Sequence, residues 1–251
     1  MRIWDVSPGY LNRQSLLGEH RELHGLYNIL IQGKRGYSRH PETLRWVGAS
    51  DALAWRHALL GAEMRLRGYV DRSPLPLQSG KVKWPESFVT EPADQFALLH
   101  DKYADKAEGR IPLPLNAQQL WAQHKYSIMA RDPEAYRDLG RAVARLRRRD
   151  AMHELARTLV VALRKPPPKG RLVNALEHIW GHVRIAANSE DKKAALRDPS
   201  ELLRRIQILA IRHREPFLLA STALGELAPY LKMADGAFCH DGCEASGACS
   251  L

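Results

Sequence analysis

The stretch RQSLLGEHRELHGLYNILIQ, residues 13–32, decides the fold of the first part of the chain. Its larger side chains recur at steps of three and four residues, at Leu16, Leu17, His20, Leu23, Tyr27 and Leu30. That spacing is typical of a helix that buries one face. The next residue is Gly33, and glycine commonly ends helices. The sequence therefore predicts a helix over residues 13–32.

Helical periodicity continues through the rest of the chain. A second helix is expected to begin at Ser50 or Asp51 and to stop at Gly68. Further helices are expected at 92–106, 116–131, 132–149, 150–164, 171–187, from Asp198 onward, and at 215–232. The sequence offers no useful alternating Val, Ile and Thr run that would predict a strand. The expected fold class is all-α, with a compact helical N-terminal domain followed by a C-terminal helical domain.

The connector Gly109–Pro114 contains a glycine and two prolines, which favour a loop, and we place a domain boundary there. The expected domains are residues 1–110 and 115–232, with a tail at 233–251. The three cysteines of the chain, Cys239, Cys243 and Cys249, all lie in this tail. The body therefore has no possible disulfide, which fits a reducing compartment.

The charge of the chain indicates a polyanionic partner. Lys and Arg number 38 against 28 Asp and Glu, for a formal net charge of +10. Nucleic acid is the first candidate for such a partner. The sequence lacks a long apolar run and a secretory leader pattern, so we expect no membrane association and a cytoplasmic, nucleoid-associated protein.

Three motifs lie close together near the N-terminus: Met1-Arg2-Ile3-Trp4, the helical segment Glu19-His20-Arg21-Glu22-Leu23, and the basic loop Gly33–Pro41. They resemble the pyrimidine-dimer DNA glycosylase family typified by phage endonuclease V, over about residues 1–84. The resemblance implies glycosylase and abasic-site lyase chemistry on DNA, through an imine formed by the N-terminal amine. Near pH 7 an α-amine is neutral, and hence nucleophilic, in a larger fraction of molecules than a lysine amine is.

The resemblance also assigns roles to individual residues. Arg2 is too large for ordinary removal of the initiator, so the retained Met1 would supply the amine, and Glu22 would act as general acid and base. The DNA-binding residues implied are Arg2, Arg21, Lys34, Arg35, Tyr37, Arg39 and His40. The chain departs from the phage pattern at Ser15, where the phage chain has His, and at His24-Gly25, where it has Pro-Arg. These departures limit how much of the phage lesion recognition can be transferred.

The second half resembles the YbgA-like domain of unknown function, through segments at 121–130, 136–140 and 167–181. That resemblance implies a helical domain and no particular chemistry, and its protein partner is unknown. His178 and His182 are spaced as a possible metal pair, and His240 with the three tail cysteines offers a second possible metal site. Neither pattern is a recognised motif, so we expect no metal and no cofactor.

The expected function is therefore DNA repair. The leading hypothesis is a pyrimidine-dimer DNA glycosylase with abasic-site lyase activity, acting on double-stranded DNA that contains damaged pyrimidines. Two alternatives remain open. One is a non-catalytic nucleic-acid-binding protein, and the other is an enzyme that acts on another modified nucleobase.

Overall fold

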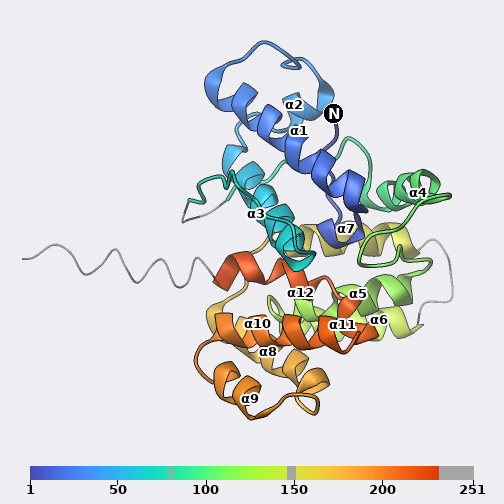
Figure 1. Ribbon diagram of the computed structural model, residues 1–251. Helices are drawn as coiled ribbons and strands as arrows, with labels where there is room; N and C mark the ends of the chain where they lie inside the picture. Colours follow the sequence, from blue (N-terminus) through green and yellow to red (C-terminus); the bar gives the residue numbers. More distant parts are fainter. Residues whose placement is uncertain (79, 81, 146–150, 232–251) are drawn as a thin grey trace, which may run out of the picture.

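The computed structural model describes residues 1–78, 80, 82–145 and 151–231. Over these residues the chain forms α-helices and one short 3-10 helix, η1, and no strand (Figure 1). This confirms the all-α prediction. None of the helices in this part of the chain is long and apolar enough to cross a bilayer.

The helices follow one another in a simple order. The first part contains η1 (Pro8–Tyr10), α1 (Arg13–Gln32), α2 (Pro41–Arg45), α3 (Ser50–Leu66) and α4 (Pro92–Tyr103). The second part contains α5 (Ala117–Met129), α6 (Pro133–Arg145), α7 (Ala151–Leu163), α8 (Lys169–Val183), α9 (Ser189–Ala195), α10 (Pro199–Arg212), α11 (Pro216–Leu219) and α12 (Ala223–Glu226).

Local capping chemistry explains where the predicted helices begin and end. The Asn12 side chain accepts a hydrogen bond from Ser15 N, which starts α1, and Gly33 ends it in the left-handed conformation with φ of 65°. Asp198 starts α10 in the same way, ahead of a proline at the first helical position. These boundaries match those expected from the sequence.

The expected helix at 215–232 is wrong in one respect, because it is broken into α11 and α12. Tertiary hydrogen bonds interrupt it. The Arg110 guanidinium donates to the carbonyls of Leu219 and Ser221, at 2.6 and 3.1 Å. The Thr222 N–H donates to the carbonyl of Gln123 on α5. Backbone groups used in these contacts cannot all continue the helical ladder.

Two apolar cores organise the helices. In the first, Leu16, Leu23 and Leu26 of α1 pack with Leu53 and Leu60 of α3, and all five are fully buried. This core continues across the connector Gly109–Pro114 into α5, α6 and α7. The second core lies mainly between α8 and α10, at the opposite end of the molecule from α2 (Figure 1). The domain boundary at the connector stays a prediction.

Candidate active site

The N-terminal segment lies against α1 and is held there by two carboxylates one helical turn apart. The Arg2 N–H donates to Glu22 Oε2 at 2.6 Å, and the Trp4 N–H donates to Glu19 Oε1 at 3.2 Å. Met1 is partly buried against the first core. The terminal residue is therefore adjacent in sequence to the N–H that binds the Glu22 carboxylate. The fold therefore places the Glu22 carboxylate on the backbone of the residue that follows Met1.

The two carboxylates have different surroundings. Glu22 is exposed, whereas Glu19 is only 3% exposed and forms a bidentate ion pair with Arg56, at 2.7 and 2.9 Å. Burial raises the pKa of Glu19, and the Arg56 charge opposes that rise. Arg56 also donates to the carbonyl of Val6 at 2.8 Å. The Glu19–Arg56 pair thus fixes the N-terminal segment, while Glu22 stays open to solvent.

A cleft of about 310 Å³ opens beside these groups. Its lining comes from the N-terminal segment, α1 and α4: Arg2, Trp4, Gln14, Ser15, Gly18, Glu19, Glu22, Leu98 and Lys102. The volume falls within the range of small-molecule sites. The cleft therefore offers the exposed carboxylate of Glu22 for proton transfer, and the cations Arg2 and Lys102 for contacts to anions.

Arg2 is anchored at this cleft. Its guanidinium donates to Thr90 Oγ1 at 3.2 Å and lies 5.0 Å from the centre of the Trp4 ring, within the range of a cation–π contact. Arg21 follows on the exposed surface of α1 beside Glu22. These two cations are the predicted DNA-binding residues nearest to the candidate catalytic pair.

The other predicted DNA-binding residues lie on the loop between α1 and α2. Lys34, Arg35 and Arg39 are exposed there, and Tyr37 is 66% exposed. His40 is half-buried, and its Nδ1 accepts a hydrogen bond from Glu42 N at 3.1 Å, which caps α2. The loop begins eleven residues after Glu22, so the rise of the helix places it about 16 Å farther along α1. It therefore lies beyond the cleft.

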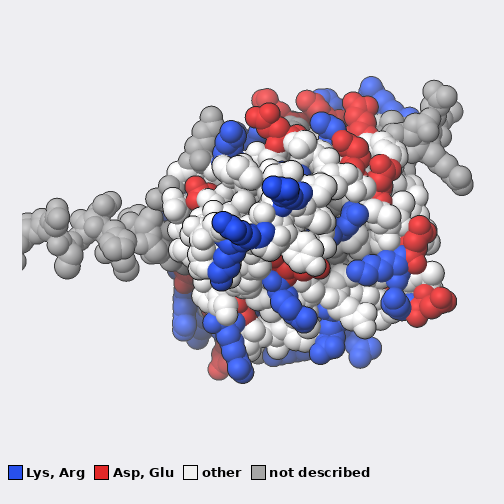
Figure 2. All heavy atoms as spheres, turned by 90° about the horizontal axis from the view of Figure 1, so that it is seen from above, with Lys and Arg blue, Asp and Glu red and all other residues white. Residues whose placement is uncertain are grey.

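Figure 2 shows the end of the molecule that carries this loop, seen from above. Lys and Arg side chains are spread over the centre and the lower edge of this face, whereas most Asp and Glu lie along the upper border and at the right-hand edge, with some Lys and Arg among them. A basic surface of this kind favours a polyanion.

Sequence reasoning missed several groups that the fold brings to the site. Lys102 and Leu98 enter the cleft from α4, some eighty residues away in sequence from Glu22, and nothing in their local sequence marked them. Arg56 lies within the second expected helix, and nothing in its local sequence marked it. The i,i+4 pair His20 and His24 gave a usable signal on α1, and His57 lies next to both rings.

The sequence offered two possible metal sites, the pair His178 and His182 and the group of cysteines and His240 in the tail. His178 is exposed, and His182 Nε2 lies 2.7 Å from the Tyr126 hydroxyl, with its ring stacked on Phe217. The group Cys239, His240, Cys243 and Cys249 lies outside the described residues. Among the residues that are described, the group with ligand atoms close enough for a metal is His20, His24 and His57.

Residues 1–77 match the family of pyrimidine dimer DNA glycosylases. This segment contains the N-terminal residues, α1, the basic loop, α2 and α3, and the match confirms the resemblance seen in the sequence. It stops before α4. Residues 125–225 match a family of proteins of unknown function, DUF1722, as expected for the second half. Comparison with curated proteins and with solved structures gave no match.

Proposed function

We propose that this protein is a DNA repair enzyme, a pyrimidine-dimer DNA glycosylase with abasic-site lyase activity. One observation carries the proposal. In a segment that matches this family, the Arg2 N–H donates to the Glu22 carboxylate at the edge of a charged cleft. The nucleophile next to that carboxylate is then the Met1 amine.

The chemistry follows from these two groups. The neutral Met1 amine attacks C1′ of the damaged nucleotide, and the bond from C1′ to the base breaks, so that the base leaves with the bonding electrons and takes up a proton. Loss of the amine protons and opening of the sugar ring give an imine. Glu22 protonates the ring oxygen and then removes a proton from C2′, and the 3′ phosphate leaves by elimination.

The remaining cleft groups suit a nucleotide taken out of the duplex. Trp4 lines the cleft beneath the Arg2 guanidinium, and Arg2 and Lys102 offer positive charge to flanking phosphates. The exposed loop cations Lys34, Arg35 and Arg39, about 16 Å from Glu22 along α1, would contact phosphates several nucleotides away. Arg21, next to Glu22, would contact a phosphate near the damaged nucleotide. Tyr37 and His40 are the remaining loop contacts that we assign to DNA.

The decisive experiment is borohydride trapping of the imine on ultraviolet-irradiated and abasic-site duplexes. The native chain is used after mass spectrometry has shown that it starts at Met1. It is compared with a chain carrying a Gly-Ser extension before Met1, and with Glu22→Gln. Glu177→Gln is the matched control, because Glu177 is also an exposed helical carboxylate but lies on α8.

We expect a covalent adduct with the native chain and with Glu177→Gln, and none with the extended chain. Glu22→Gln should lower base release and strand cleavage about a hundredfold or more. Absence of an adduct with the native chain on both duplexes would contradict the proposal. Salt-sensitive binding that neither the extension nor Glu22→Gln affects would then favour the binding-only alternative. Release of a base other than a dimerised pyrimidine would favour the other-nucleobase alternative.

A further inference from the structure

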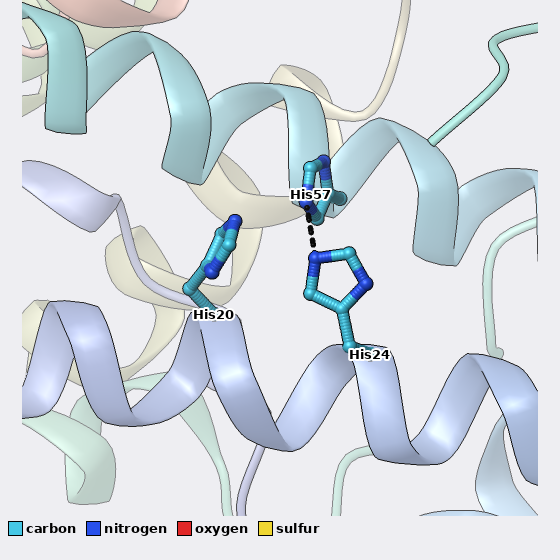
Figure 3. A group of neighbouring side chains, drawn as sticks. All are labelled: His20, His24 and His57. Carbon is cyan, nitrogen blue, oxygen red and sulfur yellow. Dashed lines mark hydrogen bonds between the residues drawn. The ribbon is translucent and has the colours of Figure 1, made fainter. Parts of the chain in front are cut away.

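Three histidine rings converge between α1 and α3 (Figure 3). His20 and His24 lie one helical turn apart on α1, and His57 reaches them from α3. His24 Nε2 and His57 Nε2 are 3.0 Å apart, and one ligand atom from each of the three rings falls within 4.8 Å of the others. The rings come from two different helices, so the cluster joins them.

A carboxylate lies next to two of the three rings. Asp71 Oδ1 lies 3.3 Å from His20 Nε2, and Asp71 Oδ2 lies 3.9 Å from His57 Nε2. The chain turns back after α3 at Gly68, which has a φ of 81°, and this turn brings Asp71 alongside the helix. A Cβ at Gly61 would lie 3.0 Å from Asp71 Oδ2, so the carboxylate rests closely against α3.

The distances among these atoms suit a tetrahedral metal ion. Zinc bonds to imidazole nitrogen and carboxylate oxygen are about 2.0–2.2 Å long, which places neighbouring ligand atoms about 3.3 Å apart. The separations of 3.0, 3.3 and 3.9 Å scatter around that value. Side-chain rotations would close the three histidine nitrogens, which lie within 4.8 Å of one another, and one Asp71 oxygen onto a single ion.

The cluster is largely shielded from water. The side chains of His57 and Asp71 are 2% and 6% exposed, and that of His20 is 16% exposed. An imidazole nitrogen in such a site can offer its lone pair to a metal. The charged groups that face the cluster are Asp71 and Arg65, so the carboxylate would supply the negative charge next to a cation.

We propose that His20, His24, His57 and Asp71 bind one divalent cation of the zinc class. Three imidazoles and one carboxylate are typical zinc ligands, and a fully protein-ligated site of this kind is structural. Glu22 lies about 160–200° around α1 from His20 and His24, given the 100° turn per residue. The ion would therefore clamp α1 to α3 from the side opposite the cleft, independently of the proposed catalysis. This replaces the expectation that the chain holds no metal.

The test uses the full chain with Cys239, Cys243 and Cys249 all changed to Ser, so that tail thiols cannot contribute metal. The protein is stripped with a chelator, loaded with Zn²⁺ or Co²⁺, and dialysed. Bound metal is counted by elemental analysis, and Co²⁺ is followed by its visible absorption bands. The variants are His24→Gln, whose ring is half-exposed, and Asp71→Asn. His178→Gln is the control, as an exposed histidine on α8.

We expect one ion per chain, tetrahedral Co²⁺ bands, and a higher melting temperature on adding Zn²⁺. His24→Gln should weaken metal binding at least tenfold and abolish the thermal shift while the chain stays folded, and Asp71→Asn should weaken binding to a smaller extent. His178→Gln should leave stoichiometry unchanged. Failure of the serine background to retain metal would overturn the proposal, as would retention that is equal in His24→Gln and in the background protein. In either case the four side chains form a hydrogen-bonded cluster only.

Discussion

The buried pair Glu19–Arg56 allows a sharp test of how the N-terminal segment is held. Both residues are 3% exposed, and Arg56 also binds the carbonyl of Val6. Arg56→Met keeps most of the side-chain volume and removes the charge. Glu19 is then left as a buried carboxylate with one remaining hydrogen bond from the Trp4 N–H.

The expected cost is large because a buried charge loses its partner. Breaking such a pair by removing one member costs about 3–5 kcal/mol. For a chain of this size, 1 kcal/mol lowers the melting temperature by about 2–4 °C, so Arg56→Met should melt roughly 10 °C lower near pH 8. Removing both charges together, in Arg56→Met with Glu19→Gln, should restore part of that loss.

The pH dependence identifies the cause. Burial already raises the pKa of Glu19 in the intact protein, and loss of Arg56 raises it further. A carboxyl group with a raised pKa in the folded state binds more protons than it does in the unfolded state, so folding becomes less stable as pH rises from about 4.3 through the folded-state pKa. The deficit of Arg56→Met should therefore be smaller at pH 5 than at pH 8.

The assay is urea unfolding of the wild type, both single variants and the double variant at pH 5 and pH 8. If Arg56→Met and the double variant lose equal unfolding free energy, and the loss does not depend on pH, the explanation by an unpaired charge is wrong. Lost packing, and not an unpaired Glu19 charge, would then be the cause of the instability. If the Glu19–Arg56 pair positions the residues that precede Val6, Arg56→Met should also lower the yield of the trapped imine.

Three other predictions concern separate parts of the chain. Burial lowers the pKa of His124 to about 4, so between pH 8 and pH 5 the unfolded chain takes up a proton that the folded chain does not. The free energy of unfolding should therefore fall by about 2 kcal/mol over this range. In His124→Gln this pH dependence should be absent from urea unfolding. Gly109→Ala should destabilise the fold strongly, because its Cβ would lie 2.5 Å from the backbone of residues 9 and 10. Gly25→Ala, on α1 with open space around it, should instead raise the free energy of unfolding by about 0.5–1 kcal/mol, as measured in thermal melts. Lys34 and Arg35 are replaced together by Ala, and DNA binding is measured by fluorescence titration at several salt concentrations. The slope of the logarithm of the binding constant against the logarithm of salt concentration should become shallower by about two. An unchanged slope would show that these two side chains do not contact phosphates.

The sequence by itself determined most helices and their ends. Residues 13–32 show the three- and four-residue spacing of a buried helical face, and Asn12 and Gly33 supply the caps. These signals are readable because helical hydrogen bonds and caps connect residues no more than four positions apart. The short helix α2, capped by His40, was missed because five residues give too little periodicity to detect. The motifs of the first forty residues also sufficed to indicate the glycosylase family.

Only the tertiary structure decided which side chains meet. The contact between Arg2 and Glu22 spans twenty residues, the Glu19–Arg56 pair spans thirty-seven, and His57 is thirty-three residues from His24. The break between α11 and α12 likewise depends on Arg110, more than a hundred residues earlier. Such contacts follow from how the buried faces of helices pack, and no local pattern encodes that packing. The sequence thus pointed to Met1 and Glu22, whereas the fold supplied the cleft beside Glu22 and the histidine cluster on the other side of α1.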